Sequence, residues 1–411
     1  MSNSSRQFSP YTSGYLFARK KSEYGGKQQD YINETQRIIK NMAEQWHQAV
    51  GDKKNLIQLF HETLNIAGQE RNQLAAKHHT QGAASFGKRS DQPENFGGSP
   101  FTPLVPLYEE YNKRVLADIQ NYLKKMPHTP AQFKQTELKE ADQPCLGHKA
   151  STEVLIMTFE EIKKHIYTAF GLEDYVRLCE LCGIAPIKET TKGFNLMDEI
   201  WNLTQNKETM QTLKQKSIDE YKKLKLFTII SDIKKSMGPH EKKTDWVLVT
   251  KRLEVEGKMY ALSQYITWLN RDLRTDPVTR MLDHSEVAII HQDVFLIEKM
   301  LASMAKQFEK IINWNGANQD ELQNMIALFQ YEFSHAMPFM RGSAAVGEWF
   351  ETAMYRFHGL EASYNNQHHI NLEALVSSLK DFVQRYPSFI KLEKLPTPDT
   401  SSAAKAGPNM G

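Results

Sequence analysis

The last third of the chain contains a short segment whose residue types suit the binding of a phosphate group. Arg341, Gly342 and Ser343 follow Pro338, which breaks one predicted helix, and they open the next. A helix start presents unbonded N–H groups and the positive end of its dipole, and a neighbouring arginine can donate two hydrogen bonds to one phosphate. We therefore predict that Arg341 and Gly342 bind a nucleotide together with His335. Ser343 would either bind a phosphate or be the polar group nearest to a phosphate group that is transferred.

This segment also has a purely structural interpretation, which the sequence leaves open. Ser343 would then only cap a helix, because serine is favoured at that position. Arg341 would be a surface charge, and His335 a residue favoured by the dipole at a helix C-terminus. The segment is not a Walker A loop, because it lacks the Gly-Lys-Ser/Thr ending.

A histidine and a glutamate further along have the spacing of a general-base pair. His369 and Glu373 are four residues apart, so on a helix they share one face. A carboxylate bonded to one imidazole nitrogen fixes the tautomer and raises the basicity of the other nitrogen. In the structural alternative, Asn371 is a helix N-cap, Glu373 a first-turn acid and the histidines loop residues.

Cysteine and histidine spacing raises the question of a zinc site. Cys145-x-x-His148 and Cys179-x-x-Cys182 supply two ligand pairs and use every cysteine in the chain. The stretch before Gly183 has the pattern of a helix, however, and cysteines three residues apart on its inner face would simply be buried. We do not expect zinc, whereas a divalent metal with ATP stays open.

The periodicity of apolar residues predicts an all-α fold, with a multi-helix N-terminal region and a larger helical C-terminal domain. Gly68 is predicted to end the second helix, and Trp246–Thr250 is a lone possible strand, which makes no sheet. The predicted helices cover residues 31–46, 53–67, 107–125, 152–170, 173–182, 196–204, 207–237, 257–273, 284–313, 318–335, 343–358 and 371–386. The predicted segments are a flexible arm (1–29), a helical region with long loops (30–150), a helical catalytic domain (151–395) and a disordered tail (396–411).

Composition excludes several classes of protein. The formal charge of +2 gives no overall attraction to nucleic acid, and no apolar run approaches the ~18 residues of a membrane span. The polar N-terminus lacks a signal-peptide core, so we predict synthesis in a cytosol without use of the general secretory route, which leaves specialised secretion open. Zinc-protease and serine-hydrolase motifs are absent.

Together, Ser343, His369 and Glu373 resemble a group of translocated bacterial effectors and toxins of the Legionella phosphoryl-AMPylase type. That group has a serine followed downstream by His-x-x-x-Glu, and its known activity is AMP transfer from ATP. The resemblance covers roughly the last hundred residues. It implies ATP as cofactor, host actin as a partner and activator, and action in the host cytoplasm.

A weaker likeness is to the loop of Fic-type AMP transferases. His335, Pro338 and Phe339 precede a helix as in that loop, but Arg341 stands in place of the metal-binding acid and the Asn-Gly is missing. The Fic mechanism is therefore not carried over to this chain.

Two functions follow from these patterns. The first is an effector that transfers AMP from ATP to a host target, which requires Arg341, Ser343, His369 and Glu373 to line one cleft. The alternative is a non-enzymatic helical effector or adaptor that binds a host protein.

Overall fold

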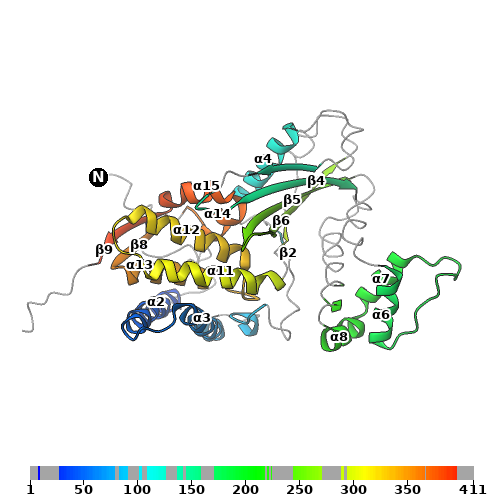
Figure 1. The fold of residues 1–411 in the computed structure, drawn as a ribbon, viewed down its shortest axis with the longest axis horizontal. Helices are drawn as coiled ribbons and strands as arrows, with labels where there is room; N and C mark the ends of the chain where they lie inside the picture. Colours follow the sequence, from blue (N-terminus) through cyan, green and yellow to red (C-terminus); the bar gives the residue numbers. More distant parts are fainter. Residues whose placement is uncertain are drawn as a thin grey trace, which may run out of the picture.

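The structure is a computed structural model, and Figure 1 shows its fold. The residues that it describes are 8–9, 27–78, 83–90, 101–103, 109–125, 137–141, 145–158, 171–217, 220–221, 224, 244–270, 288–290, 294–365 and 367–395. The predicted tail at 396–411 and most of the predicted arm at 1–29 lie outside these residues.

The largest core is a stack of long helices. An N-terminal pair, α2 (Lys27–Gly51) and α3 (Leu56–His78), lies below α11 (Val294–Ile312), α12 (Gln319–Ala336) and α13 (Ser343–Phe357) in Figure 1. Aromatic side chains from all five helices share one buried cluster, which includes Trp46, Phe60, Phe308, Phe329 and Phe350. Burial of such rings is a main source of folding free energy, so the N-terminal and C-terminal helices form one core.

The all-α prediction is wrong, because the described residues also form two antiparallel sheets. The larger sheet has six strands in the order β2-β7-β6-β5-β4-β3. Its strands are β2 (Phe101–Pro103), β3 (Glu137–Ala141), β4 (Ala150–Thr158), β5 (Thr244–Val255), β6 (Lys258–Asn270) and β7 (Ala288–Ile290). The smaller has the order β1-β8-β9 and contains β1 (Phe8–Ser9), β8 (Leu360–Asn365) and β9 (Ile390–Lys394).

The six-stranded sheet replaces the helix that we predicted at 257–273 and the starts of those predicted at 152–170 and 284–313. Strands β5 and β6 are joined by a two-residue turn, Glu256-Gly257, in which both residues have positive φ (53° and 78°). Two-residue turns with positive φ at both positions match the right-handed twist of the two strands that they join in a β-hairpin. The apolar run Trp246–Thr250 is thus the beginning of a long central strand.

Helix α4 (Glu109–Lys125) connects this sheet to the C-terminal helices. Its residues Tyr111, Val115 and Ile119 share an apolar cluster with the sheet and with α14 (Ile370–Val376). A further short helix, α15 (Leu379–Arg385), and the turn η9 (Tyr386–Ser388) precede β9. The predicted single helix at 371–386 is therefore two helices, separated at Ser377 and Ser378.

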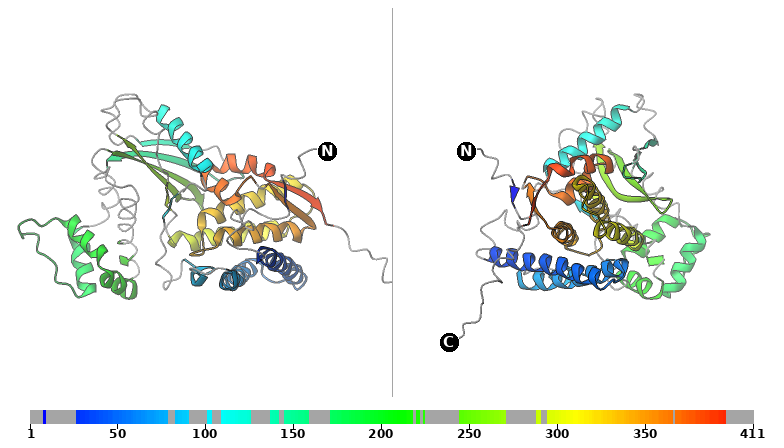
Figure 2. Two further views of the ribbon diagram at one scale, coloured as in Figure 1. Left: turned by 180° about the vertical axis from the view of Figure 1, so that it is seen from behind. Right: turned by 60° about the vertical axis from the view of Figure 1, so that its left-hand side comes forward.

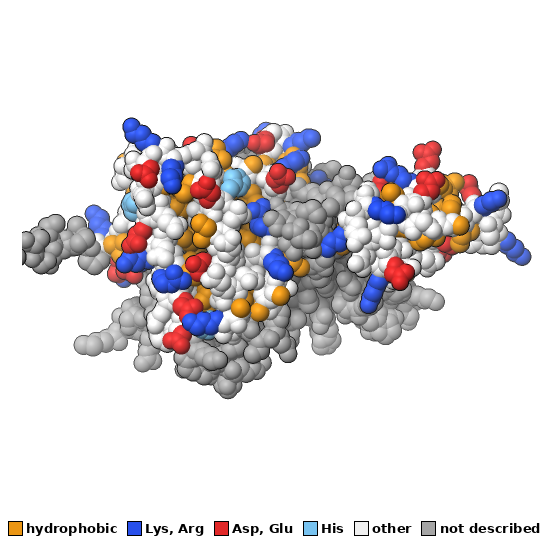
Figure 3. All heavy atoms as spheres, turned by 90° about the horizontal axis from the view of Figure 1, so that it is seen from below, with side chains coloured by type: hydrophobic (Ala, Val, Ile, Leu, Met, Phe, Trp, Pro, Cys, Tyr) orange, Lys and Arg blue, Asp and Glu red, His pale blue; other side chains and the backbone are white. Residues whose placement is uncertain are grey.

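A group of three shorter helices stands away from the rest of the molecule (Figures 1 and 2). It contains α6 (Leu172–Cys182) and α7 (Leu196–Gln205), close to the predicted bounds, and α8 (Lys207–Lys216). The prediction of one helix over 207–237 is wrong, because α8 ends at Lys216 and Ser217 is extended. Elsewhere, on the face seen from below in Figure 3, acidic and basic side chains are interspersed. No helix in the described ranges is both long and apolar enough to span a membrane.

Candidate functional site

The connection between α12 and α13 is a tight corner built on two left-handed residues. Met337 ends α12 with φ 45°, and Gly342 precedes α13 with φ 90°. The hydroxyl of Ser343 donates to the carbonyl of Phe339 and accepts from its N–H, both at 3.0 Å. Ser343 is only 1% exposed, so its hydroxyl closes the corner and does not face a ligand.

A segment from the N-terminal region runs along this corner. Gly87 donates its N–H to the carbonyl of Arg341 (3.0 Å), and Met340 donates to that of Lys88 (2.8 Å). Behind this segment, a Cβ on Gly68 would lie 2.7 Å from the carbonyl oxygen of Gly87. Gly68 therefore allows a close backbone approach in the middle of α3, and our prediction that it ends the helix is wrong.

Two arginines meet at the start of α13. The guanidinium carbons of Arg71 and Arg341 lie 4.3 and 4.7 Å from the centre of the Phe86 ring. A Cβ on Gly342 would lie 2.9 Å from both Cγ and Nε of Arg71, so the glycine makes room for the arginine. Gly342 supplies no side-chain cap to α13, whose first N–H groups cannot bond within the helix.

Arg71 is the unusual member of this corner. It is 2% exposed, and its Nε and Nη1 have no hydrogen-bond partner among the described residues. Burial lowers the pKa of Arg71, Tyr31 raises it and Arg341 lowers it further. None of these groups is a carboxylate. Among the described residues, no carboxylate thus acts as a counter-charge to this guanidinium, and a buried charge without one is costly.

A cavity of about 730 Å³ adjoins the corner. Phe86 and Phe339 form part of its wall, and the remainder comes from α3 and the segment after Phe86. The polar side chains that line it are Asn65, Gln69, Asn72, Gln73, Lys88 and Arg89. This volume is in the range of small-molecule sites.

His335 does not contribute to this surface. It is completely buried in α12, and its ring lies 4.5 Å from that of Tyr331. The prediction that His335 contacts a nucleotide therefore gains no support from its position.

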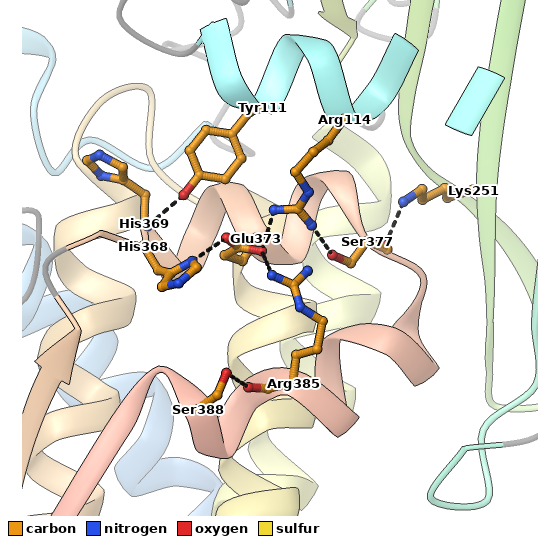
Figure 4. A network of polar contacts seen from close by, with 9 residues as sticks. All are labelled: Tyr111, Arg114, Lys251, His368, His369, Glu373, Ser377, Arg385 and Ser388. Atoms are coloured by element: carbon orange, nitrogen blue, oxygen red, sulfur yellow. Dashed lines mark hydrogen bonds and ion pairs between the residues drawn. The ribbon is translucent and has the colours of Figure 1, made fainter. Parts of the chain in front are cut away.

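Glu373 is the centre of a second polar network (Figure 4). Its Oε1 bonds to Nδ1 of His368 (2.7 Å), and its Oε2 pairs with Nη1 of Arg114 (2.7 Å) and Nη2 of Arg385 (3.2 Å). Burial acts to raise the pKa of Glu373, but His368 and the two arginines together hold it below its ordinary value. Glu373 is therefore an ionised, nearly inaccessible carboxylate.

The imidazole paired with Glu373 is that of His368, whereas we predicted His369. Helix α14 begins at Ile370, so His369 is its N-cap residue and lies outside the helical face of Glu373. The backbone N–H of His369 donates to the hydroxyl of Tyr111 (2.8 Å). The predicted chemistry, a carboxylate that orients an imidazole, is thus present one residue earlier.

The same network ties α14 to α4 and to the sheet. Nη2 of Arg114 donates to the hydroxyl of Ser377 (3.2 Å), and Nζ of Lys251 donates to the Ser377 carbonyl (2.6 Å). Sequence reasoning missed Arg114, Lys251 and Arg385, because Arg114 and Lys251 are far from Glu373 along the chain and no local pattern marks them.

The structure does not join Ser343 with Glu373 as one site. The hydrogen bonds of Ser343 end on Phe339, and those of Glu373 end on His368 and Arg114. The first group packs beside α3, the second beside α4 and α15, so the two share no partner.

The cysteines are not gathered into a metal centre. Cys145 and His148 face each other across a tight turn through backbone bonds, whereas Cys179 is buried in α6 and Cys182 Sγ lies 3.8 Å from the Thr209 carbonyl. Within the described ranges, no three His, Cys, Asp or Glu side chains are placed to hold a metal ion.

Comparison with known protein families gives a match over part of the chain. Residues 246–393 match a family described as avirulence protein, AvrB_AvrC, so this region is similar to bacterial effectors that are delivered into host cells. The match supports a bacterial effector with a host protein as target, but it gives no support to an AMP-transferase signature at Ser343, His369 and Glu373, although these residues lie within the matched range. No curated protein matches the chain significantly.

Proposed function

We propose that this bacterial effector binds a phosphorylated ligand, with ATP as the first candidate, at the N-terminus of α13. The observation that carries the proposal is the buried guanidinium of Arg71, whose Nε and Nη1 have no partner among the described residues. A phosphate there would receive hydrogen bonds from Arg71 and Arg341 and would lie at the positive end of the helix dipole.

The free-energy argument favours an anion over water at this place. A buried unpaired charge costs several kcal/mol, and Arg341 adds repulsion to Arg71. A phosphate with two negative charges would remove both costs. The adjoining cavity of about 730 Å³ is large enough to receive the rest of a small molecule.

For bound ATP, we propose AMP transfer to a host protein as the reaction: a nucleophilic side chain of the host protein attacks the α-phosphorus, the bond to the oxygen that bridges to the β-phosphorus breaks, and pyrophosphate leaves. Two arginines and a helix N-terminus would stabilise the charge that develops on the transferred group. In this proposal Ser343 contributes its backbone N–H, because its hydroxyl is bonded to Phe339. No general base is assigned, since His368 and Glu373 belong to the other network.

The first experiment measures binding. Calorimetric titration of the full chain with ATP and with inorganic phosphate is expected to show binding that weakens about tenfold or more in Arg341→Met, since a hydrogen bond to a charged group contributes roughly 1.5–3 kcal/mol. Arg356→Met, at the other end of α13, is the matched control. No binding, or equal binding by both variants, would overturn the proposal.

The second experiment measures transfer. The full chain is incubated with ATP labelled in the adenosine part and with host-cell extract, with and without actin. Label that becomes attached to protein, and is lost in Arg341→Met, supports AMP transfer. ATP binding without AMP release or transfer would leave a nucleotide-binding effector and refute the reaction.

A non-enzymatic effector that binds a host protein is the second candidate function. The observation that favours it is the group of helices α6 to α8, which stands apart from the main body (Figure 1). The segment after α6 exposes two large apolar side chains, Ile184 and Ile187. If the corner binds no phosphate, this surface becomes the first place to map a host partner.

A further inference from the structure

The network around Glu373 brings two arginines and a histidine to one carboxylate. Arg114 and Arg385 pair with Glu373, and Lys251 donates to the carbonyl of Ser377, whose hydroxyl accepts from Arg114. Asp118 also lies near Arg114 and Lys251; burial raises its pKa, the charges of Lys251 and Arg114 oppose this shift, and Asp381 adds to it. The carboxylate of Asp381, at the start of α15, accepts a hydrogen bond from the hydroxyl of Ser378, and the same hydroxyl accepts one from the Asp381 N–H.

Several donors of this network remain available to a ligand. In the described part of the chain, Arg385 bonds to protein through Nη2 and His368 through Nδ1, which leaves Nε and Nη1 of Arg385 and Nε2 of His368 for a ligand. Arg385, Arg114 and His368 are 40%, 30% and 27% exposed, respectively. These groups are therefore reachable from solvent, while the carboxylate that fixes them is not.

The orientation of these donors is set before any ligand arrives. Oε2 of Glu373 contacts both guanidinium groups, and Oε1 holds the imidazole. The Phe389 ring contacts two of these side chains: the centre of the His368 ring lies 4.8 Å from its centre, and the guanidinium carbon of Arg385 lies 5.3 Å from it. Held donors lose little rotamer entropy on binding, which favours affinity.

We propose that Arg385, Arg114 and His368 form a second anion site, which binds a phosphate monoester as its dianion. A guanidinium fork suits the two oxygens of a phosphate, and the imidazole adds one donor when it is protonated. The two guanidinium groups share the single carboxylate of Glu373, so they attract a dianion more strongly than a singly charged diester. This site is independent of the one proposed at α13, since the two share no residue.

The test uses the full-length Arg341→Met variant, in which the α13 site is weakened. Its histidines are labelled with ¹⁵N, and the His368 resonances are identified by comparison with His368→Gln. Inorganic phosphate, O-phosphoserine and dimethyl phosphate are then titrated in turn. We expect the first two to shift the His368 imidazole resonances in a saturable way, and the diester to bind at least tenfold more weakly.

The comparison of the first two probes identifies the source of the phosphate. Tighter binding of O-phosphoserine indicates a phosphorylated side chain or metabolite, whereas equal binding indicates free phosphate. Either result supports a monoester or phosphate dianion site. Equal binding of dimethyl phosphate would overturn the inference, as would resonances of His368 that none of the probes moves.

Variants of Arg385 provide the control for folding. Arg385→Met is expected to weaken phosphate binding tenfold or more, and Arg385→Lys, which keeps the charge but loses the fork, to weaken it less. Arg177→Met, on the distant helix α6, is the matched control. If Arg385→Met does not fold, Arg385→Lys alone decides: unchanged affinity together with unchanged preference for the dianion would contradict the assigned role of Arg385.

Discussion

At the scale of single residues, the start of α13 depends on a glycine, Gly342, and on an arginine, Arg71, whose side chain lies where a side chain at position 342 would otherwise be. Gly342 has φ 90°, a conformation that costs other residues free energy. The side chain of Arg71 also leaves no room for a Cβ at position 342. Arg71 can reach the Phe86 ring and the helix N-terminus only because position 342 has no side chain.

Gly342→Ala is therefore expected to lower stability and to displace Arg71. The strained φ costs about 1–2 kcal/mol, and the contact at 2.9 Å with Cγ and Nε of Arg71 adds to this cost. The free energy of unfolding in urea measures the sum, and ATP titration measures the loss of the anion site.

Gly359→Ala is the matched control for this prediction. Gly359 also has a positive φ (71°), but a Cβ there would meet nothing within 4 Å. The Gly359→Ala variant should lose only the part of the unfolding free energy that comes from the positive φ, and it should bind ATP as tightly as the original chain. If both alanine variants lose equal stability and bind ATP equally well, the close packing of Gly342 on Arg71 has no energetic consequence.

At the scale of elements, the sequence predicted helices far better than strands. The bounds of α12 and α13 were predicted within a residue or two, because their apolar residues recur at helical spacing. The strands were not predicted, because a strand is stabilised by its partners in the sheet, and these can be far away in the sequence. Strand β4 pairs with β5, although about ninety residues separate them along the chain. Trp246–Thr250 looked like an isolated strand for the same reason.

The candidate sites show the same limit. Arg341, Gly342 and Ser343 could be identified at a helix start from local residue types, but Arg71 comes from α3 and has no sequence signal. Likewise Glu373 was found by its spacing from a histidine, while the choice between His368 and His369 depended on where α14 begins. The local sequence pattern therefore locates the end of a helix, but only the tertiary structure determines which side chains from other elements contact it.

The connection between α12 and α13 gives a prediction that separates structure from catalysis. Ser343→Ala removes both hydrogen bonds to Phe339 and leaves a buried N–H and carbonyl without that partner. We expect a loss of about 1–3 kcal/mol in the free energy of unfolding, with ATP affinity changed less than about threefold. Abolished AMP transfer by a variant that still folds and binds ATP would instead assign the hydroxyl a catalytic role.

At the scale of the whole molecule, two buried acids in the central helices couple folding to pH. Burial raises the pKa of Glu332, on α12, to about 8, although Gln307 and Ser303 offset part of the effect. Burial also raises the pKa of Glu351, on α13, to about 8, with a hydrogen bond from Tyr386 opposing it and the charge of Glu348 adding to it. Both groups are thus protonated in the folded chain at neutral pH.

The sign of the resulting pH dependence follows from proton binding. Between the ordinary pKa of a glutamate and about 8, the folded chain holds a proton on each acid that the unfolded chain has released. Stability must therefore fall as pH rises through this window, by up to ~1.4 kcal/mol per pH unit for each acid.

Glu351→Gln tests this coupling, because glutamine keeps the shape of the protonated acid and can still accept the bond from Tyr386. The urea unfolding free energy, measured between pH 5 and 8, should fall less steeply with pH in this variant than in the original chain, and the variant should be the more stable of the two near pH 8. Glu298→Gln, at an exposed position on α11, should leave the slope unchanged, because water solvates that carboxyl in both states. Parallel pH profiles for the original chain and Glu351→Gln would mean that Glu351 is ionised in the folded core, and then a cation or water must reach it there.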